Sequence, residues 1–295
     1  MSLTITGTFA YTEDATIREH HLADDMIVET NAIGGEIIKR GLYKYGFLNS
    51  ALVQWYLDTT GHKRIKGDKS ATKLCSTGEL RKFTLERGHG LPAMNVYTLS
   101  DDMAEQMYRK QKGYREYDRA VTNEAIPYIL ENLSLAQFHI LSLSNPKAQE
   151  QYYNHPVLLR DGRAVTIPSL IRYKSSFANT LFLVAMPLPK SREVKETSLF
   201  ISRLMLIKEY FGEKQETYQN ISYIIVCDSD EQIRDMATLI DQMADLKDIF
   251  IMYSRGSLWG AGDKKDGARP DDPLKKLYKC EIESGRADMS LVRFR

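Results

Sequence analysis

Residues 68–99 read DKSATKLCSTGELRKFTLERGHGLPAMNVYTL, and this stretch predicts a short helix followed by a β-hairpin. Asp68 is expected to be the N-cap of the helix, because its carboxylate can accept the free amides of the first turn. Leu80–Leu85 and Met94–Leu99 are the predicted strands, with RGHGLP as the turn between them. The helix carries one narrow apolar stripe at the i, i+3, i+4 and i+7 spacing, made of Ala71, Leu74, Cys75 and Gly78.

Helices are also predicted on both sides of this segment. The apolar spacing indicates helices over 33–45 and 52–57, of which the first ends at Gly46 and the second is capped by Asn49 or Ser50. Ser100 is a cap for a further helix after the hairpin. Three helices, a hairpin and another helix are the order of a winged helix-turn-helix domain, which we assign to residues 29–113. A small helical domain whose charged hairpin only keeps it soluble is the alternative.

Charge is unevenly spread along the chain. The net charge is +1, from 40 basic and 39 acidic residues, so a strongly basic, histone-like mode of nucleic-acid binding is excluded. Residues 62–90 hold eight basic and three acidic side chains, a net charge of +5, and predict a DNA-binding surface. Residues 1–30 have a net charge of −5, and residues 1–28 are interpreted as a loosely held acidic arm. The predicted DNA-binding residues are Lys63, Arg64, Lys66, Lys69, Ser70, Thr72, Lys73, Ser76, Thr77, Arg81, Lys82, Arg87 and His89.

The second half of the chain predicts an α/β domain over residues 120–260. A helix over 120–142 precedes a hairpin that turns at Asp161-Gly162, and a buried strand follows over 178–186. A helix over 194–211, a strand over 221–227, a helix over 231–243 and a strand over 249–253 complete it. This order is that of a restriction-endonuclease-like, PD-(D/E)XK-like core. A Rossmann half would need helices between the early strands, and no glycine-rich phosphate loop follows any strand.

Together the two patterns resemble the replication-relaxation family of plasmids and integrative conjugative elements, over about residues 30–255. The resemblance implies an α/β fold with a winged helix joined to a nuclease-like domain. It also implies a DNA-binding accessory or regulatory protein in plasmid replication, relaxosome assembly or conjugative transfer. Double-stranded DNA is the implied partner, with a relaxase or another conjugation or replication protein as a further candidate. Whether the protein forms a homodimer is left open.

The acids that a nuclease of this fold needs are missing from the expected positions. These positions carry Pro168-Ser169 and residues 184–186, Val-Ala-Met, none of which can hold a divalent metal. We therefore predict no catalytic residue, no metal and no cofactor, and a domain used for assembly. One alternative is a nuclease with a displaced site that uses Lys190 with Glu193 or Glu196. The other is a protein-binding adaptor without DNA affinity.

The remaining features point to a cytoplasmic protein. The chain has neither a signal-peptide pattern nor a run of 18 apolar residues. Its three cysteines are widely spaced, so we interpret them as reduced, buried thiols. His139 lies in an apolar stretch and is expected to be a core histidine. The charged tail, residues 261–295, begins as a predicted mobile linker, and the weakly apolar segment behind the linker is free to dock back.

Overall fold

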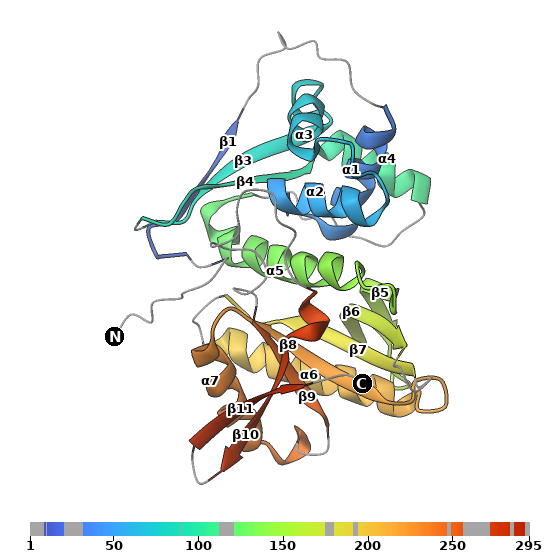
Figure 1. Ribbon diagram of the computed structural model, residues 1–295, viewed down its shortest axis with the longest axis vertical. Coiled ribbons are helices and arrows are strands. Elements are labelled where there is room, and N and C mark those ends of the chain that lie inside the picture. Colours follow the sequence, from blue (N-terminus) through green and yellow to red (C-terminus); the bar gives the residue numbers. More distant parts are fainter. Residues whose placement is uncertain are drawn as a thin grey trace. The chain divides into compact units, whose positions relative to one another are not determined.

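The computed structural model describes residues 9, 11–20, 32–88, 90–111, 121–174, 180–190, 194–246, 249–255, 272–283 and 286–292. Helices and strands occur throughout these ranges, and the chain has a mixed α/β fold, as predicted. It divides into two compact units, Phe9–Ile140 and Leu141–Arg295, called unit 1 and unit 2 below. Both are drawn in Figure 1.

Unit 1 contains a four-stranded antiparallel sheet in the order β1-β3-β4-β2. Its last helix, α5, ends two residues inside unit 2. The elements are β1 (Thr16–His20), α1 (Ala32–Tyr45), β2 (Leu48–Asn49), α2 (Ser50–Thr59), α3 (Gly67–Ser76), β3 (Leu80–Glu86), β4 (Met94–Leu99), α4 (Asp101–Gln111), η1 (Asn123–Ala125) and α5 (Ile126–Ser142).

Helix ends in unit 1 agree with the capping residues of the sequence in two cases. α1 ends before Gly46, whose φ of 79° lies in the left-handed region that favours glycine, and whose amide bonds the Leu42 carbonyl at 2.8 Å. The Asn49 side chain caps α2 by accepting the Leu52 amide at 2.9 Å. Asp68 differs from its prediction. α3 begins at Gly67, so Asp68 lies within the first turn and its carboxylate is engaged by other elements.

The prediction of a loosely held acidic arm is wrong for residues 11–20. Thr16–His20 form β1, which pairs along its whole length with β3. Phe9 and Ala15 are buried, so the chain before the strand also contributes to the core of unit 1. Five residues are too few for a period-2 pattern to be recognised, and the partner strand lies more than 60 residues away. Residues 1–8, 10 and 21–31 lie outside the described residues.

α5 is a buried helix that belongs mainly to unit 1, whereas the sequence assigned 120–142 to the second domain. Pro127 lies in its first turn, where a missing amide costs nothing. His139 is a fully buried core histidine whose ring packs edge-on to Tyr45 of α1 at 5.9 Å. Tyr128 packs in the same way against Phe47. These aromatic contacts with α1 and the chain after it attach α5 to unit 1.

Unit 2 contains a seven-stranded sheet in the order β11-β10-β9-β8-β7-β6-β5. β5, β6 and β7 are antiparallel, β7, β8 and β9 are parallel, and the last two pairings are antiparallel. The elements are β5 (Ala148–Leu158), β6 (Ala164–Lys174), β7 (Thr180–Pro187), α6 (Val194–Glu213), β8 (Ile221–Cys227), α7 (Asp230–Asp241), η2 (Ala244–Leu246), β9 (Ile251–Arg255), η4 (Pro273–Lys275), β10 (Leu277–Glu283) and β11 (Arg286–Val292).

The core of unit 2 lies between its sheet and the helices α6 and α7. Leu204 and Ile207 of α6 share one apolar cluster with Ile233 of α7 and with Ile225 and Cys227 of β8. The order from α5 to β9 is the predicted one, including a crossover helix between the parallel strands β7 and β8. The relationship to restriction endonucleases stays a prediction.

The end of the tail packs onto this sheet. β10 pairs with β9 through Leu277 and Tyr278, and β11 pairs with β10 along its full length. Docking of the weakly apolar segment is therefore confirmed, while Pro273–Lys275, expected in the linker, form η4. Leu274 and Leu277 are buried, which explains why this charged stretch is held. Residues 261–271 lie outside the described residues.

None of the described helices has both the length and the apolar character needed to cross a membrane.

Candidate nucleic-acid interface

The basic side chains of α3 and of the loop before it are available to a ligand. Lys63, Arg64, Lys66 and Lys69 are exposed and Lys73 is half-buried. Among the described residues, none of these five cations has a carboxylate within ion-pair distance. The positive charge that the sequence predicts here is therefore not neutralised by neighbouring described side chains.

Several basic residues elsewhere differ in this respect. Lys39 of α1 contacts Glu36 and Glu79, each with 2.6 Å between nitrogen and oxygen. Arg163 of unit 2 pairs in the same way with two carboxylates, at 2.5 Å each. Counting basic residues along the chain does not separate these two classes. The contacts do, and they place the five cations of α3 and its leading loop among the unpaired ones of the described residues.

α3 is held firmly against α2 and the sheet. A Cβ atom on Gly67 would lie 3.0 Å from Val53 Cγ1 and 3.1 Å from the Gln54 backbone nitrogen, so only glycine fits this close approach to α2. The Gly67 amide donates to the Gln54 side chain at 2.8 Å. These contacts fix the start of α3 against α2.

Asp68 ties the same turn to two further elements. Its Oδ1 accepts hydrogen bonds from Ser50 Oγ and from the Tyr97 hydroxyl, both at 2.8 Å. Burial and the Asp68 carboxylate raise the pKa of Tyr97 to about 12, so this hydroxyl remains a donor at neutral pH. Tyr97 belongs to β4, so α3 lies on the face of the sheet that carries Tyr97.

The hydroxyl groups of α3 divide into two sets. Ser76 Oγ donates to the Lys73 carbonyl at 2.8 Å, and Thr77 Oγ1 lies 3.1 Å from the Leu74 carbonyl. These two hydroxyls provide hydrogen-bond donors to carbonyl groups in the last turn of their own helix. Ser70 and Thr72, both half-buried, come from the middle of α3. Unlike Ser76 and Thr77, Ser70 and Thr72 do not donate to carbonyl groups at the end of the helix.

Arg81 and Arg87, both predicted to contact DNA, are not free at the surface of the hairpin. Arg81 forms a two-pronged ion pair with Glu19 of β1, with both N–O distances at 2.7 Å. Arg87 is only 6% exposed, and its Nε donates to the Pro92 carbonyl at 2.9 Å across the turn. Burial lowers the pKa of the Arg87 guanidinium. Arg81 therefore ties β3 to β1, and Arg87 stabilises the turn of the hairpin.

Two other hairpin residues complete the predicted set. Lys82 is half-buried on β3 beside Cys75 of α3, where its charge partly opposes the effect of burial. Burial raises the pKa of the Cys75 thiol to about 12, which agrees with an unreactive thiol. His89 lies outside the described residues.

Sequence reasoning missed Arg18 and His20, which β1 brings to the same sheet. Both are exposed, and His20 Nε2 lies 2.6 Å from Thr84 Oγ1 of β3. The only local signal was the β-branched pair Thr16-Ile17 at the start of a short polar run, which does not distinguish a strand from a loop.

Unit 2 buries the positions at which a nuclease of this fold carries its acids, and it also buries Lys190 of the displaced-nuclease alternative. Ser169, Val184, Ala185 and Met186 are all buried. Lys190 is 2% exposed and pairs with Asp228, which is 1% exposed. Glu196 is half-buried in the first turn of α6, and Glu193 lies outside the described residues. In the part of the chain that the structure describes, no three His, Cys, Asp or Glu side chains gather in a way that could hold a metal ion.

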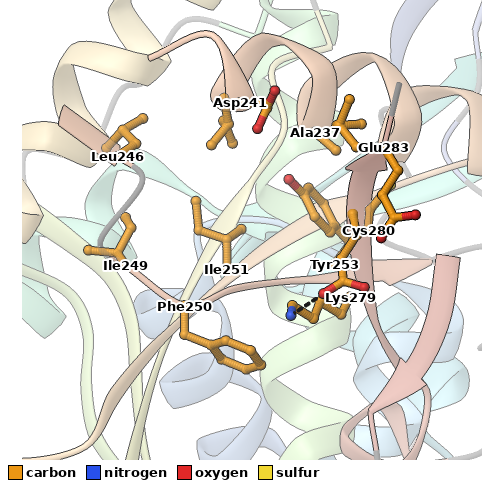
Figure 2. A pocket seen from close by; sticks show the side chains of 13 residues that line it. Ala237, Asp241, Leu246, Ile249, Phe250, Ile251, Tyr253, Lys279, Cys280 and Glu283 are labelled. Carbon is orange, nitrogen blue, oxygen red and sulfur yellow. Dashed lines mark hydrogen bonds and ion pairs between the residues drawn. The ribbon is translucent and has the colours of Figure 1, made fainter. Parts of the chain in front are cut away.

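A hollow of about 480 Å³ lies in unit 2 between α7, β9 and β10. Figure 2 shows part of its lining, with Phe250 beside Lys279. Lys279 forms an ion pair with Glu281, which also lines the hollow. Tyr253 contributes a buried hydroxyl whose pKa is raised by burial. The hollow combines apolar walls with side chains of both charges, so it does not have the character of a phosphate-binding site.

Comparison of the chain with protein-family models, with curated proteins and with solved structures finds no match.

Proposed function

We propose that unit 1 is a winged helix-turn-helix domain that binds double-stranded DNA, with α3 in the major groove. The observation that carries this proposal is the set of five cations on α3 and its leading loop that lack carboxylate partners among the described residues. Lysine and arginine side chains of this kind contact phosphates, and the Ser70 hydroxyl is suited to base edges or phosphates.

The arrangement of elements supports this proposal. α1, the short strand β2, α2, α3 and the β3–β4 hairpin follow one another, and β2 pairs with β4. α3 is fixed at its start by Gly67 and Asp68, so its outer face is presented in one orientation. A preorganised helix loses little conformational entropy on binding.

For unit 2 we propose a role in assembly, with the chain itself or with a protein of DNA replication or transfer. Lys190, which a displaced nuclease site would need in contact with substrate, is buried in an ion pair with Asp228. The place of the protein in a mobile element, and its location in the cytoplasm, are proposed from the resemblance of the sequence to the replication-relaxation family.

Duplex-DNA binding measured by fluorescence anisotropy across a salt series tests the proposal. Lys69→Glu/Lys73→Glu should lower the magnitude of the slope of log affinity against log salt concentration by about 2. The loss of two phosphate contacts corresponds to a roughly 60-fold weaker affinity at 0.1 M salt.

Lys195→Glu/Lys214→Glu is the matched control, because it changes net charge equally at two exposed positions of unit 2. The control should keep the wild-type affinity and slope. An equal effect of both double variants would show that only overall charge matters. A wild-type protein without salt-sensitive duplex affinity would favour the protein-binding adaptor.

A further inference from the structure

β1 adds a row of side chains to the sheet face on which α3 lies. Directly paired residues of antiparallel strands point to the same face. His20 pairs with Lys82, and Lys82 pairs in turn with Tyr97, whose hydroxyl reaches α3. Arg18 pairs with Thr84 and therefore points to this face as well. β1 thus extends the α3 side of the sheet by one strand.

The side chains of this face are polar and hydrogen-bonded to one another. His20 Nε2 lies 2.6 Å from Thr84 Oγ1, and Thr84 Oγ1 lies 3.1 Å from Asn95 Oδ1, so the row crosses three strands. Arg18 is exposed, and within the described residues neither it nor Lys82 has a carboxylate partner. Glu86 is the acidic side chain of this face, and it lies at the end of β3 farthest from α3.

The acidic side chain of β1, Glu19, lies on the opposite face of the strand. Glu19 pairs with Phe83, so it points away from α3, and it forms the two-pronged ion pair with Arg81. Arg81 also lies over the Phe83 ring, with its guanidinium carbon 4.9 Å from the ring centroid. The strand alternation therefore separates the charges of Arg18 and Glu19. A segment that is acidic in total contributes an unneutralised cation to the α3 side.

We propose that β1 is part of the DNA-binding surface, and that Arg18 contacts a backbone phosphate beside the one contacted by Lys82. This inference rests on the proposed function of unit 1. The ligand chemistry is the duplex phosphate backbone, because the row has two cations and hydrogen-bonding groups but no apolar side chain that would stack on a base.

The test is the salt dependence of duplex binding by the full chain with Arg18→Gln. Loss of one phosphate contact should lower the magnitude of the salt slope by about 0.9 and weaken affinity about eightfold at 0.1 M salt. Arg18→Lys should retain most of the slope, because a lysine still neutralises a phosphate. Lys214→Gln, an exposed position of unit 2, is the charge-matched control and should behave as wild type.

A second variant separates a direct contact from an effect on folding. Glu19→Gln/Arg81→Gln removes the ion pair of the opposite face without changing net charge, and it should keep the wild-type slope. A wild-type slope in Arg18→Gln, with binding still dependent on Lys69 and Lys73, would overturn this inference alone. Binding that is independent of Lys69 and Lys73 would instead overturn the proposed function.

Discussion

Tyr97 is a buried side chain whose hydroxyl joins β4 to the first turn of α3. It is 0% exposed and donates to Asp68 at 2.8 Å. The same carboxylate oxygen accepts from Ser50 of α2, so three elements meet at one group. The position of the candidate DNA-binding helix therefore depends on a small hydrogen-bonded cluster and not only on apolar packing.

Tyr97→Phe should reduce the free energy of unfolding by about 1 kcal/mol at neutral pH, because one hydrogen bond to a carboxylate is lost. The pKa of Tyr97 rises from an ordinary value of 10.0 to about 12 in the folded protein. The stability that this shift contributes is fully present below about pH 10 and is lost as pH rises through about 12. Urea unfolding at a series of pH values should show the gap between the two proteins closing over that interval. A gap independent of pH would contradict this assignment.

Lys190 and Asp228 form a buried ion pair whose role we expect to be structural. Asp228→Asn should destabilise unit 2 by about 3–5 kcal/mol, because it leaves the Lys190 ammonium buried without its carboxylate. Lys190→Met/Asp228→Leu should recover most of that loss, since it removes both charges. Urea unfolding followed by circular dichroism measures both changes. A double variant as unstable as the single one would show that the pair does more than compensate its own burial.

Among the helices, α2 shows most directly how a single residue sets where an element begins. Asn49 accepts the Leu52 amide at 2.9 Å and thereby satisfies one of the free donors of the first turn. Asn49→Ala should cost about 1 kcal/mol of stability, and Asn49→Asp should cost much less because it keeps the accepting oxygen. Thermal unfolding of the three proteins checks this. Equal losses in both variants would place the effect in the β2–β4 pairing, to which Asn49 also belongs.

The strands of the two sheets differ in how well local pattern identifies them. β8 covers Ile221–Cys227, the predicted range, because its continuous apolar run is typical of a strand buried on both faces. β1 and β10 were missed, since each mixes charged and apolar residues over a few positions. β1 is held mainly by pairing with β3, which is distant in the sequence, and β10 lies between β11, which follows it directly, and the more distant β9.

For the molecule as a whole, the division into two units should allow stability and the proposed DNA binding to be changed separately. Ile225 is 1% exposed in the core of unit 2, so Ile225→Ala should cost about 2–5 kcal/mol. At a temperature where this variant remains folded, its duplex affinity should equal that of wild type. Lys69→Glu/Lys73→Glu should show the reverse, with weakened binding and little change in melting temperature. Weakened DNA binding in Ile225→Ala would show that unit 2 also takes part in the interaction.

The amino-acid sequence was sufficient to predict the mixed α/β fold and, apart from the short β2, the order of helices and strands from α1 to β9. It also indicated the α3 segment as the candidate interface, which stays a prediction. Periodicity, caps and turn residues act over a few positions, so they can be recognised without knowing what packs against them. The buried positions of α5, including His139, followed from the same local pattern.

Only the tertiary structure shows which basic side chains are paired or buried, because this depends on the packing of distant segments. Arg81 and Arg87 count as cations in the sequence, yet one is paired with Glu19 and the other is buried in a turn. Arg18 lies in an acidic segment, yet β1 turns it to the α3 side. A side chain's charge is a property of its residue type. Whether that charge reaches a ligand depends on the face and the partner it receives in the folded chain, and those are set by contacts between residues far apart in the sequence.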